Sequence, residues 1–294
     1  MQEDPLQKSS LTKKKSYRQV LRDIPWWAVV IVLVGLLFIF KVITDYKYQE
    51  TIKILIMGRP TAKAVEGILL TIRITLIAFA ISIVIGLITG LGRLSKNVIL
   101  YNLATFYVEV IRGVPLVVLM LYTAFVLLPL LIQGLNSLGA SLNIASLIDL
   151  QLRDVSFETR AIFALAFGFG AYEAEVFRAG IQSIEKGQME AARSLGMSFM
   201  QSMRHIILPQ AIRRILPPLG NDFIALLKDS SLATVLAVPE LTQLGRVQRA
   251  STFRVFEVFN SVAVLYLTMT IILSFLVRML EKKLSGDRQD ERIR

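Results

Sequence analysis

Glu190-Ala191-Ala192-Arg193-Ser194-Leu195-Gly196 is a polar stretch between two long apolar segments, and Ile206-Ile207-Leu208-Pro209 follows it after nine residues. The stretch is too short for a domain, so we interpret it as a connector between membrane spans. Gly187 is expected to cap a helix from Gln188 to Leu195, and Gly196 supplies the left-handed residue that ends it. Two helical turns are marginal alone in water, which indicates that this helix needs a partner surface.

The side chains of the expected helix suit docking onto another protein. Glu190 falls in the first turn, where the helix dipole favours an acidic residue. Ala191, Ala192 and Leu195 are expected on one side, and the two small alanines allow close approach.

The composition indicates an all-α bundle of transmembrane helices. The chain has 294 residues, of which 54% are hydrophobic, and its mean hydropathy is +0.59, too apolar for a soluble domain. The net charge of +11 comes from clusters beside apolar spans, which favours membrane orientation over nucleic-acid binding. The absence of cysteine excludes disulfides, thiolate metal sites and thiol catalysis. The single histidine, His205, is interpreted as a packed or solvated helix residue, so no metal site and no catalytic residue is expected.

Six apolar runs have the length of membrane spans. They are Ile24–Val42, Gly67–Gly92, Leu116–Gly134, Ala161–Ile181, Ile212–Val238 and Phe259–Leu280. The third is preceded by a helical run from Val98 to Arg112, which is expected to bend at Gly113-Val114-Pro115 because a residue before proline disfavours helix. The first is expected to be a retained span, since no small-x-small signal-peptide cleavage site follows it.

The basic residues orient the spans. With a cytoplasmic N-terminus, 19 lysines and arginines fall in inner segments and 10 in outer segments, so the positive-inside rule places both termini and the connector in the cytoplasm. The expected organisation is a cytoplasmic segment 1–23, an extra span 24–42, an extracytoplasmic segment 43–66, a core 67–284 and a frayed cytoplasmic tail 285–294. The outer segments 43–66 and 135–160 are long, and each is either a docking surface or a solvated connector.

Ionisable residues inside membrane spans indicate function unless they form structural ion pairs. In the fourth span Glu175 lies three residues before Arg178, on the same helical face, so this pair is structural or functional. Glu173 points to a nearly opposite side and has no obvious local partner.

The fifth span has two groups of polar residues, which we call its polar ledges. Asn221-Asp222 and Lys228-Asp229-Ser230 are about two helical turns apart and share one face, and Pro217-Pro218 is expected to kink or unwind the helix beside them. Broken helices of this kind bind solutes in transporters. The ledges are interpreted as a polar face on a pathway, and internal pairing of Lys228 is the alternative.

Several nucleotide and hydrolase motifs are missing. The sequence has no G-x-x-x-x-G-K-[ST] loop, so ATP energy has to come from a separate subunit. It also has no H-E-x-x-H or G-x-S-x-G motif, which argues against a membrane hydrolase.

Motifs along 67–284 point to one family. They are Gly67-Ile68-Leu69-Leu70-Thr71, Glu109-Val110-Ile111-Arg112-Gly113-Val114-Pro115-Leu116, Ala171-Tyr172, Glu175-Val176-Phe177-Arg178-Ala179-Gly180-Ile181, Leu208-Pro209-Gln210-Ala211, Leu216-Pro217-Pro218-Leu219-Gly220-Asn221, Leu226-Leu227-Lys228-Asp229-Ser230-Ser231-Leu232 and Pro239-Glu240-Leu241. With these motifs and the connector, the chain resembles the polar amino acid branch of ABC-importer permeases, which includes histidine, arginine and glutamine uptake systems.

The resemblance implies a five-helix type I permease core preceded by one extra span. The expected protein is a multi-pass subunit of a bacterial inner membrane that translocates polar or charged amino acids. Its expected partners are ATPase subunits that bind ATP, a second identical or homologous permease, an extracytoplasmic amino-acid-binding protein and membrane lipid; it has no cofactor of its own. Segment 187–209 becomes the cytoplasmic EAA loop that receives force from the ATPase. The coupling residues are Glu190, Ala191, Ala192, Leu195, Gly196 and Pro209.

The chain departs from the family pattern in its first span, in segment 135–160, and at Glu173, where a neutral residue is more usual. An unpaired acid in a substrate cavity favours basic amino acids. The substrate-path candidates are Glu173, Glu175, Asn221, Asp222, Lys228, Asp229 and Ser230. A membrane enzyme and a scaffold or channel subunit are the alternative functions.

Overall fold

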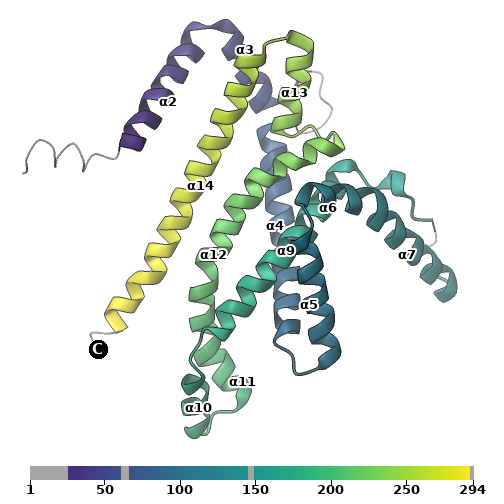
Figure 1. Cartoon of the computed structure of the whole chain (residues 1–294), viewed down its shortest axis with the longest axis vertical. Coiled ribbons are helices and arrows are strands. Elements are labelled where there is room, and N and C mark those ends of the chain that lie inside the picture. Colours follow the sequence, from purple (N-terminus) through teal and green to yellow (C-terminus); the bar gives the residue numbers. More distant parts are fainter. Residues whose placement is uncertain (1–25, 61–65, 145–148, 292–294) are drawn as a thin grey trace, which may run out of the picture. The chain divides into compact units, whose positions relative to one another are not determined.

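The computed structural model describes residues 26–60, 66–144 and 149–291, and these residues are predominantly helical (Figure 1). The expected cytoplasmic segment 1–23 lies outside the described residues. The chain divides into two compact units, residues 1–49 and 50–294, which are considered separately.

The first unit contains helix α2, Trp26–Thr44, and the start of helix α3, Tyr46–Met57. The hydrophobic side chains described on α2 are largely exposed, as expected for a helix in contact with lipid. The Asp45 carboxylate accepts a hydrogen bond from the backbone N–H of Lys47 at the α2–α3 turn. The segment 43–66, which was predicted to be extracytoplasmic, therefore contains a helix.

The second unit is built around two long helices, α4 (Ile68–Arg93) and α9 (Phe157–Gln182). Glycines allow them to approach closely, because a Cβ at Gly90 would lie 2.9 Å from the carbonyl oxygen of Ala174. The main hydrophobic core forms between these helices and their neighbours, with Ile74 and Leu165 fully buried.

The predicted bend before the third span is confirmed. Helix α5, Val98–Gly113, ends at Val114, which is extended, and helix α6, Leu116–Tyr122, begins after Pro115. The chain continues through a π-helical turn, Thr123–Leu127, into helix α7, Leu128–Leu142. The helical run extends eight residues beyond the predicted end at Gly134 because its stop signal is the left-handed Asn143.

The fifth predicted span corresponds to helix α12, Leu208–Asp229, followed by a 3₁₀ turn, Ser230–Leu236. The helix continues through Pro217 and Pro218 instead of unwinding there. Ile215 and Leu219 on either side are buried in a hydrophobic cluster, and this packing holds the helix despite the missing hydrogen bonds.

The remaining helices complete the second unit. A 3₁₀ turn, Leu152–Asp154, precedes α9, and helix α13, Leu241–Thr252, precedes helix α14, Val255–Glu291. The segment from 285, which was expected to fray, is helical to Glu291.

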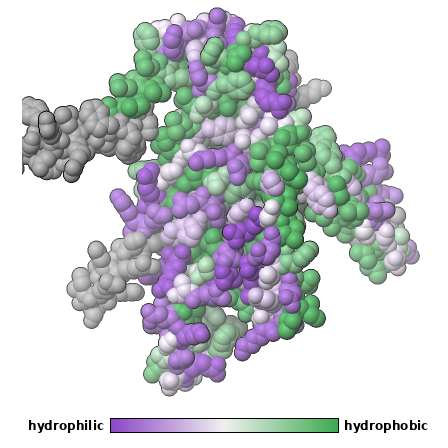
Figure 2. All heavy atoms as spheres, in the orientation of Figure 1, coloured by the Kyte–Doolittle hydropathy of each residue, from purple (hydrophilic) through white to green (hydrophobic). Residues whose placement is uncertain are grey.

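Among the described residues, three helical segments are long and apolar enough to span a membrane. They are Ile68–Arg93, Leu116–Leu142 and Val255–Lys283. Helices α9 and α12, with 26 and 22 residues, have the length to cross but carry more polar residues. Figure 2 shows hydrophobic side chains over the α5–α6 side of this unit and a mixture of hydrophilic and hydrophobic side chains around helices α10 and α11.

Candidate functional site

The polar connector begins with helix α10, Lys186–Ser194, which starts two residues earlier than predicted. Its N-cap is Glu185 instead of Gly187, so Glu190 lies in the middle of the helix and not in its first turn. The predicted end is confirmed, because Gly196 has a φ of 83°. The N–H of Gly196 bonds to the carbonyl of Arg193 and that of Met197 to the carbonyl of Ala192, the pattern of a Schellman motif.

The two faces of α10 have different environments. Ala192 is buried against the rest of the unit, whereas Ala191 and Leu195 are exposed. Of the three residues predicted to share one side, only Ala192 is buried: it anchors the helix, whereas Ala191 and Leu195 are exposed. Leu195 is 81% exposed, and Phe199 and Met200 beyond the turn are 53% and 70% exposed. We call these three side chains the connector tip.

The base of α10 rests on the ends of two long helices. Helix α11, Phe199–Ser202, begins with a capping box between Ser198 and Gln201, and a π-helical turn, Met203–Ile207, leads into α12. Pro209 occupies the first turn of α12, where its missing N–H costs little. Met189 of α10 packs on a hydrophobic cluster that includes residues of α9 and α12, so α10 is in contact with this cluster.

The predicted pair of Glu175 and Arg178 is confirmed and belongs to a larger network. Arg93, at the end of α4, places a guanidinium nitrogen 2.6 Å from Glu175 and another 3.7 Å from Glu109 of α5. Glu175 is therefore neutralised by two cations. Arg93 was not predicted as a partner because 82 residues separate it from Glu175.

The predicted polar ledges of α12 do not converge on one cavity. Lys228 lines a cavity of about 450 Å³ with Ser231, Thr242 and Tyr266. Asn221 lines a different cavity of about 260 Å³.

The acids and the serine of the candidate set have separate environments. Asp222 has a buried oxygen without a hydrogen-bond partner, and the hydroxyl of the buried Ser230 donates to the carbonyl of Leu227. Asp229 is partly buried. Glu175 lines a third cavity, beside α12, and Glu173 is fully buried between helices.

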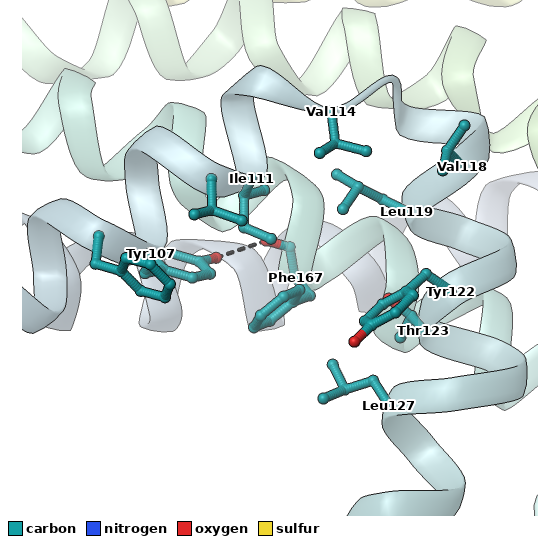
Figure 3. Close-up of a pocket in the computed structure, with 11 residues that line it drawn as sticks. Tyr107, Ile111, Val114, Val118, Leu119, Tyr122, Thr123, Leu127 and Phe167 are labelled. Atoms are coloured by element: carbon teal, nitrogen blue, oxygen red, sulfur yellow. Dashed lines mark hydrogen bonds between the residues drawn. The ribbon is translucent and has the colours of Figure 1, made fainter.

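The cavity of about 490 Å³ between α5, α6, the first π turn and α9 is apolar (Figure 3). Figure 3 shows the Tyr107 hydroxyl directed at the carbonyl oxygen of Phe167, to which it donates a hydrogen bond of 2.5 Å. The residues that line this cavity carry no charged side chain, so it offers no counter-charge to a charged solute.

The carboxylate of Glu240, for which no role was predicted, caps the start of α13 and connects it to α14. It accepts hydrogen bonds from the N–H groups of Thr242 and Gln243 and from the Tyr266 hydroxyl of α14. Next to it, the N–H of Leu241 donates to Thr71 of α4 at 3.0 Å. Burial raises the pKa of Glu240 to about 7, against these hydrogen bonds, which lower it.

Comparison with known proteins identifies the family. Residues 82–286 match the family described as the binding-protein-dependent transport system inner membrane component. The chain belongs to this family. It is therefore a multi-pass, all-α subunit of the inner membrane that works with a separate ATPase and a binding protein, and it is not itself an enzyme.

Individual relatives and solved structures agree with this membership. The glutamine transport system permease protein GlnP of Escherichia coli K12 is 37% identical over 75% of this chain and 92% of its own length. The probable glutamine ABC transporter permease protein GlnM of Bacillus subtilis is 40% identical over 74% and 92%. A crystal structure of an amino acid ABC transporter with histidines matches with a TM-score of 0.62, at 36% identity over 74% and 92% of the two chains. The MetNI methionine ABC transporter, at 21% identity and a TM-score of 0.56, supports the fold alone.

Proposed function

We propose that this chain is the permease subunit of an ATP-driven importer of polar or charged amino acids and that the connector tip docks in a groove of the ATPase. The observation that supports this proposal most strongly is that the polar connector exposes an apolar tip. Leu195, Phe199 and Met200 are exposed at and after a hydrogen-bonded Schellman turn, and exposed apolar side chains of this kind stabilise protein interfaces. Glu190, Ala191 and Pro209 are part of the same coupling segment, and Ala192 and Gly196 hold its shape.

The proposed importer has further parts. A second permease, identical or homologous, completes the pathway, lipid surrounds the pair, and both termini lie in the cytoplasm as the distribution of basic residues favours. ATP binds to the partner ATPase, and the chain holds no cofactor of its own. The names of the permease relatives and of the matching amino acid transporter support a polar amino acid as the substrate.

The proposed substrate path follows the polar face of α12. The Lys228 ammonium makes no ion pair or hydrogen bond to the part of the chain that the structure describes, and it faces a cavity with the Ser231 hydroxyl. These donors suit a substrate carboxylate, because a cation in a membrane span requires an anionic or aqueous partner. Asn221, Asp222, Asp229 and Ser230 extend the polar face. Glu175 is an ion-pair residue at its edge.

The coupling proposal is tested by comparing two glycines, Gly187 within α10 and Gly196 just after its C-terminal end. No atom lies within 4 Å of a Cβ built at Gly187 or Gly196, but only Gly196 has a positive φ. Gly196→Ala is therefore expected to strain the turn by about 1 to 2 kcal/mol and to misdirect the tip, whereas Gly187→Ala adds no such strain. We expect Gly196→Ala to weaken co-purification with the ATPase and to lower substrate-stimulated ATP hydrolysis, at unchanged membrane level. Equal behaviour of the two variants would contradict the assignment.

A further inference from the structure

Glu173 lies in the middle of α9 with its side chain fully buried. A Cβ at Gly86 of α4 would lie 2.7 Å from the Cβ of Glu173, so the two helices touch at this point. The cavities described above are lined by other residues. Because the Glu173 side chain is fully buried, a substrate does not reach its carboxyl group in this conformation.

The groups around Glu173 provide no counter-charge. Helix α4 presents Ser82, α5 presents Tyr107, and α12 presents Asp222, which is another acid. On α9 itself, Arg178 is bound to a different carboxylate. Among the described residues Glu173 has no ion pair, and an ionised carboxylate buried in this way is strongly unfavourable.

The hydrogen bonds of Ser82 indicate where the proton lies. Its Oγ is 2.7 Å from Oε1 of Glu173 and 2.9 Å from the carbonyl oxygen of Phe79. A serine hydroxyl has one proton, and a carbonyl only accepts. A neutral Glu173 supplies the proton for the shorter contact, so that both contacts are hydrogen bonds, whereas an ionised Glu173 leaves one contact without a proton. The other oxygen of Glu173, Oε2, is buried without a partner, which a neutral acid tolerates better than a carboxylate.

We propose that Glu173 is a buried proton-binding site that holds α9 against α4 by donating a hydrogen bond to Ser82. Loss of the proton leaves the single Ser82 proton to serve both the Phe79 carbonyl and the Glu173 carboxylate, and it creates a negative charge near Asp222; both effects loosen the contact between the two helices. The proton therefore regulates transport: the permease works with Glu173 neutral and slows as alkaline pH removes the proton. The transport part of this inference rests on the proposed function, but the protonation state does not.

Infrared spectroscopy of the purified complex tests the protonation state directly. A neutral carboxyl gives a C=O band that shifts in deuterium oxide, and we expect this band at neutral pH in the wild type and its loss in Glu173→Gln. Glu109→Gln is the matched control, because the Glu109 side chain is 70% exposed and forms an ion pair with Arg93; it should remove no such band. If wild type and Glu173→Gln have the same carboxyl bands, Glu173 is ionised and the proposal is wrong.

A second variant keeps the test decisive if Glu173→Gln does not assemble. Ser82→Ala removes the hydroxyl that accepts the hydrogen bond from Glu173. The C=O band of the neutral Glu173 carboxyl should therefore persist but move to higher frequency. A band at the wild-type frequency would show that Glu173 donates no hydrogen bond to Ser82.

Uptake measurements then test regulation. The ratio of uptake at about pH 7 to uptake at about pH 9 should be at least about threefold larger in the wild type than in Glu173→Gln, which cannot ionise. Equal ratios would overturn the regulatory role. Failure of the proposed function removes uptake in every variant but leaves the infrared comparison intact.

Discussion

Glu240 combines complete burial with three hydrogen-bond donors, and this combination makes the start of helix α13 sensitive to pH. Its pKa of about 7 is raised from the ordinary 4.5, chiefly by burial. The folded state therefore holds the proton more tightly than the unfolded state. The stability that this contributes is complete below about pH 4.5 and is lost as pH rises to about 7.

We expect Glu240→Gln, which cannot titrate, to remove this dependence. Between about pH 5 and about pH 7 the stability of the wild type relative to the variant should fall by roughly 1.4 kcal/mol per pH unit. Thermal unfolding of the detergent-solubilised proteins at several pH values measures the difference. A difference between wild type and variant that stays constant from about pH 5 to about pH 7 would show that Glu240 is ionised throughout this range and would contradict the raised pKa.

At the scale of helices, the contact between α4 and α9 depends on glycines that leave no room for a side chain. A Cβ at Gly86 would lie 2.7 Å from the Cβ of Glu173 and 3.1 Å from the backbone nitrogen of Ala174, which cannot move aside. We expect Gly86→Ala to destabilise the protein by about 1 to 3 kcal/mol through overpacking. Gly134→Ala in α7 is the control, because no atom lies within 4 Å of its Cβ.

The control should be neutral or stabilise by up to about 1 kcal/mol, since alanine favours helix. The unfolding temperatures of the two variants give the comparison. If Gly86→Ala were as stable as Gly134→Ala, α4 and α9 would lie far enough apart at Gly86 to accommodate a methyl group.

Helix boundaries were predictable from the sequence where the signal is local. Gly196 ends α10 and Pro115 separates α5 from α6, because each residue has few allowed conformations. The continuation of α12 through Pro217 was not predictable, since it depends on packing against residues distant in the sequence. For the same reason, the ion pair between Arg93 and Glu175 was not predictable. The burial of Ala192 beside the exposed Ala191 was not predictable either.

Across the whole chain, the predicted six-span arrangement determines on which side of the membrane each segment is expected. Because the fourth and fifth spans flank the connector, an even number of spans places both termini on its side. The excess of lysine and arginine in the inner segments favours the cytoplasm for that side. The chain has no cysteine, so single introduced cysteines report their location without background.

Three exposed, uncharged positions suit this experiment because their replacement leaves the count of basic residues unchanged: Gln49, Ser141 and Ser194. Gln49→Cys and Ser141→Cys lie in outer segments and should react with a membrane-impermeant thiol reagent in intact cells. Ser194→Cys lies in the connector and should react only after permeabilisation, because the reagent cannot reach the cytoplasm. Labelling of Ser194→Cys in intact cells would place the connector outside, where no ATPase can reach it, and would refute both the topology and the coupling proposal. If only Gln49→Cys were protected from the reagent, the first helix would not cross the membrane. The assignment of the five-helix core would be unaffected.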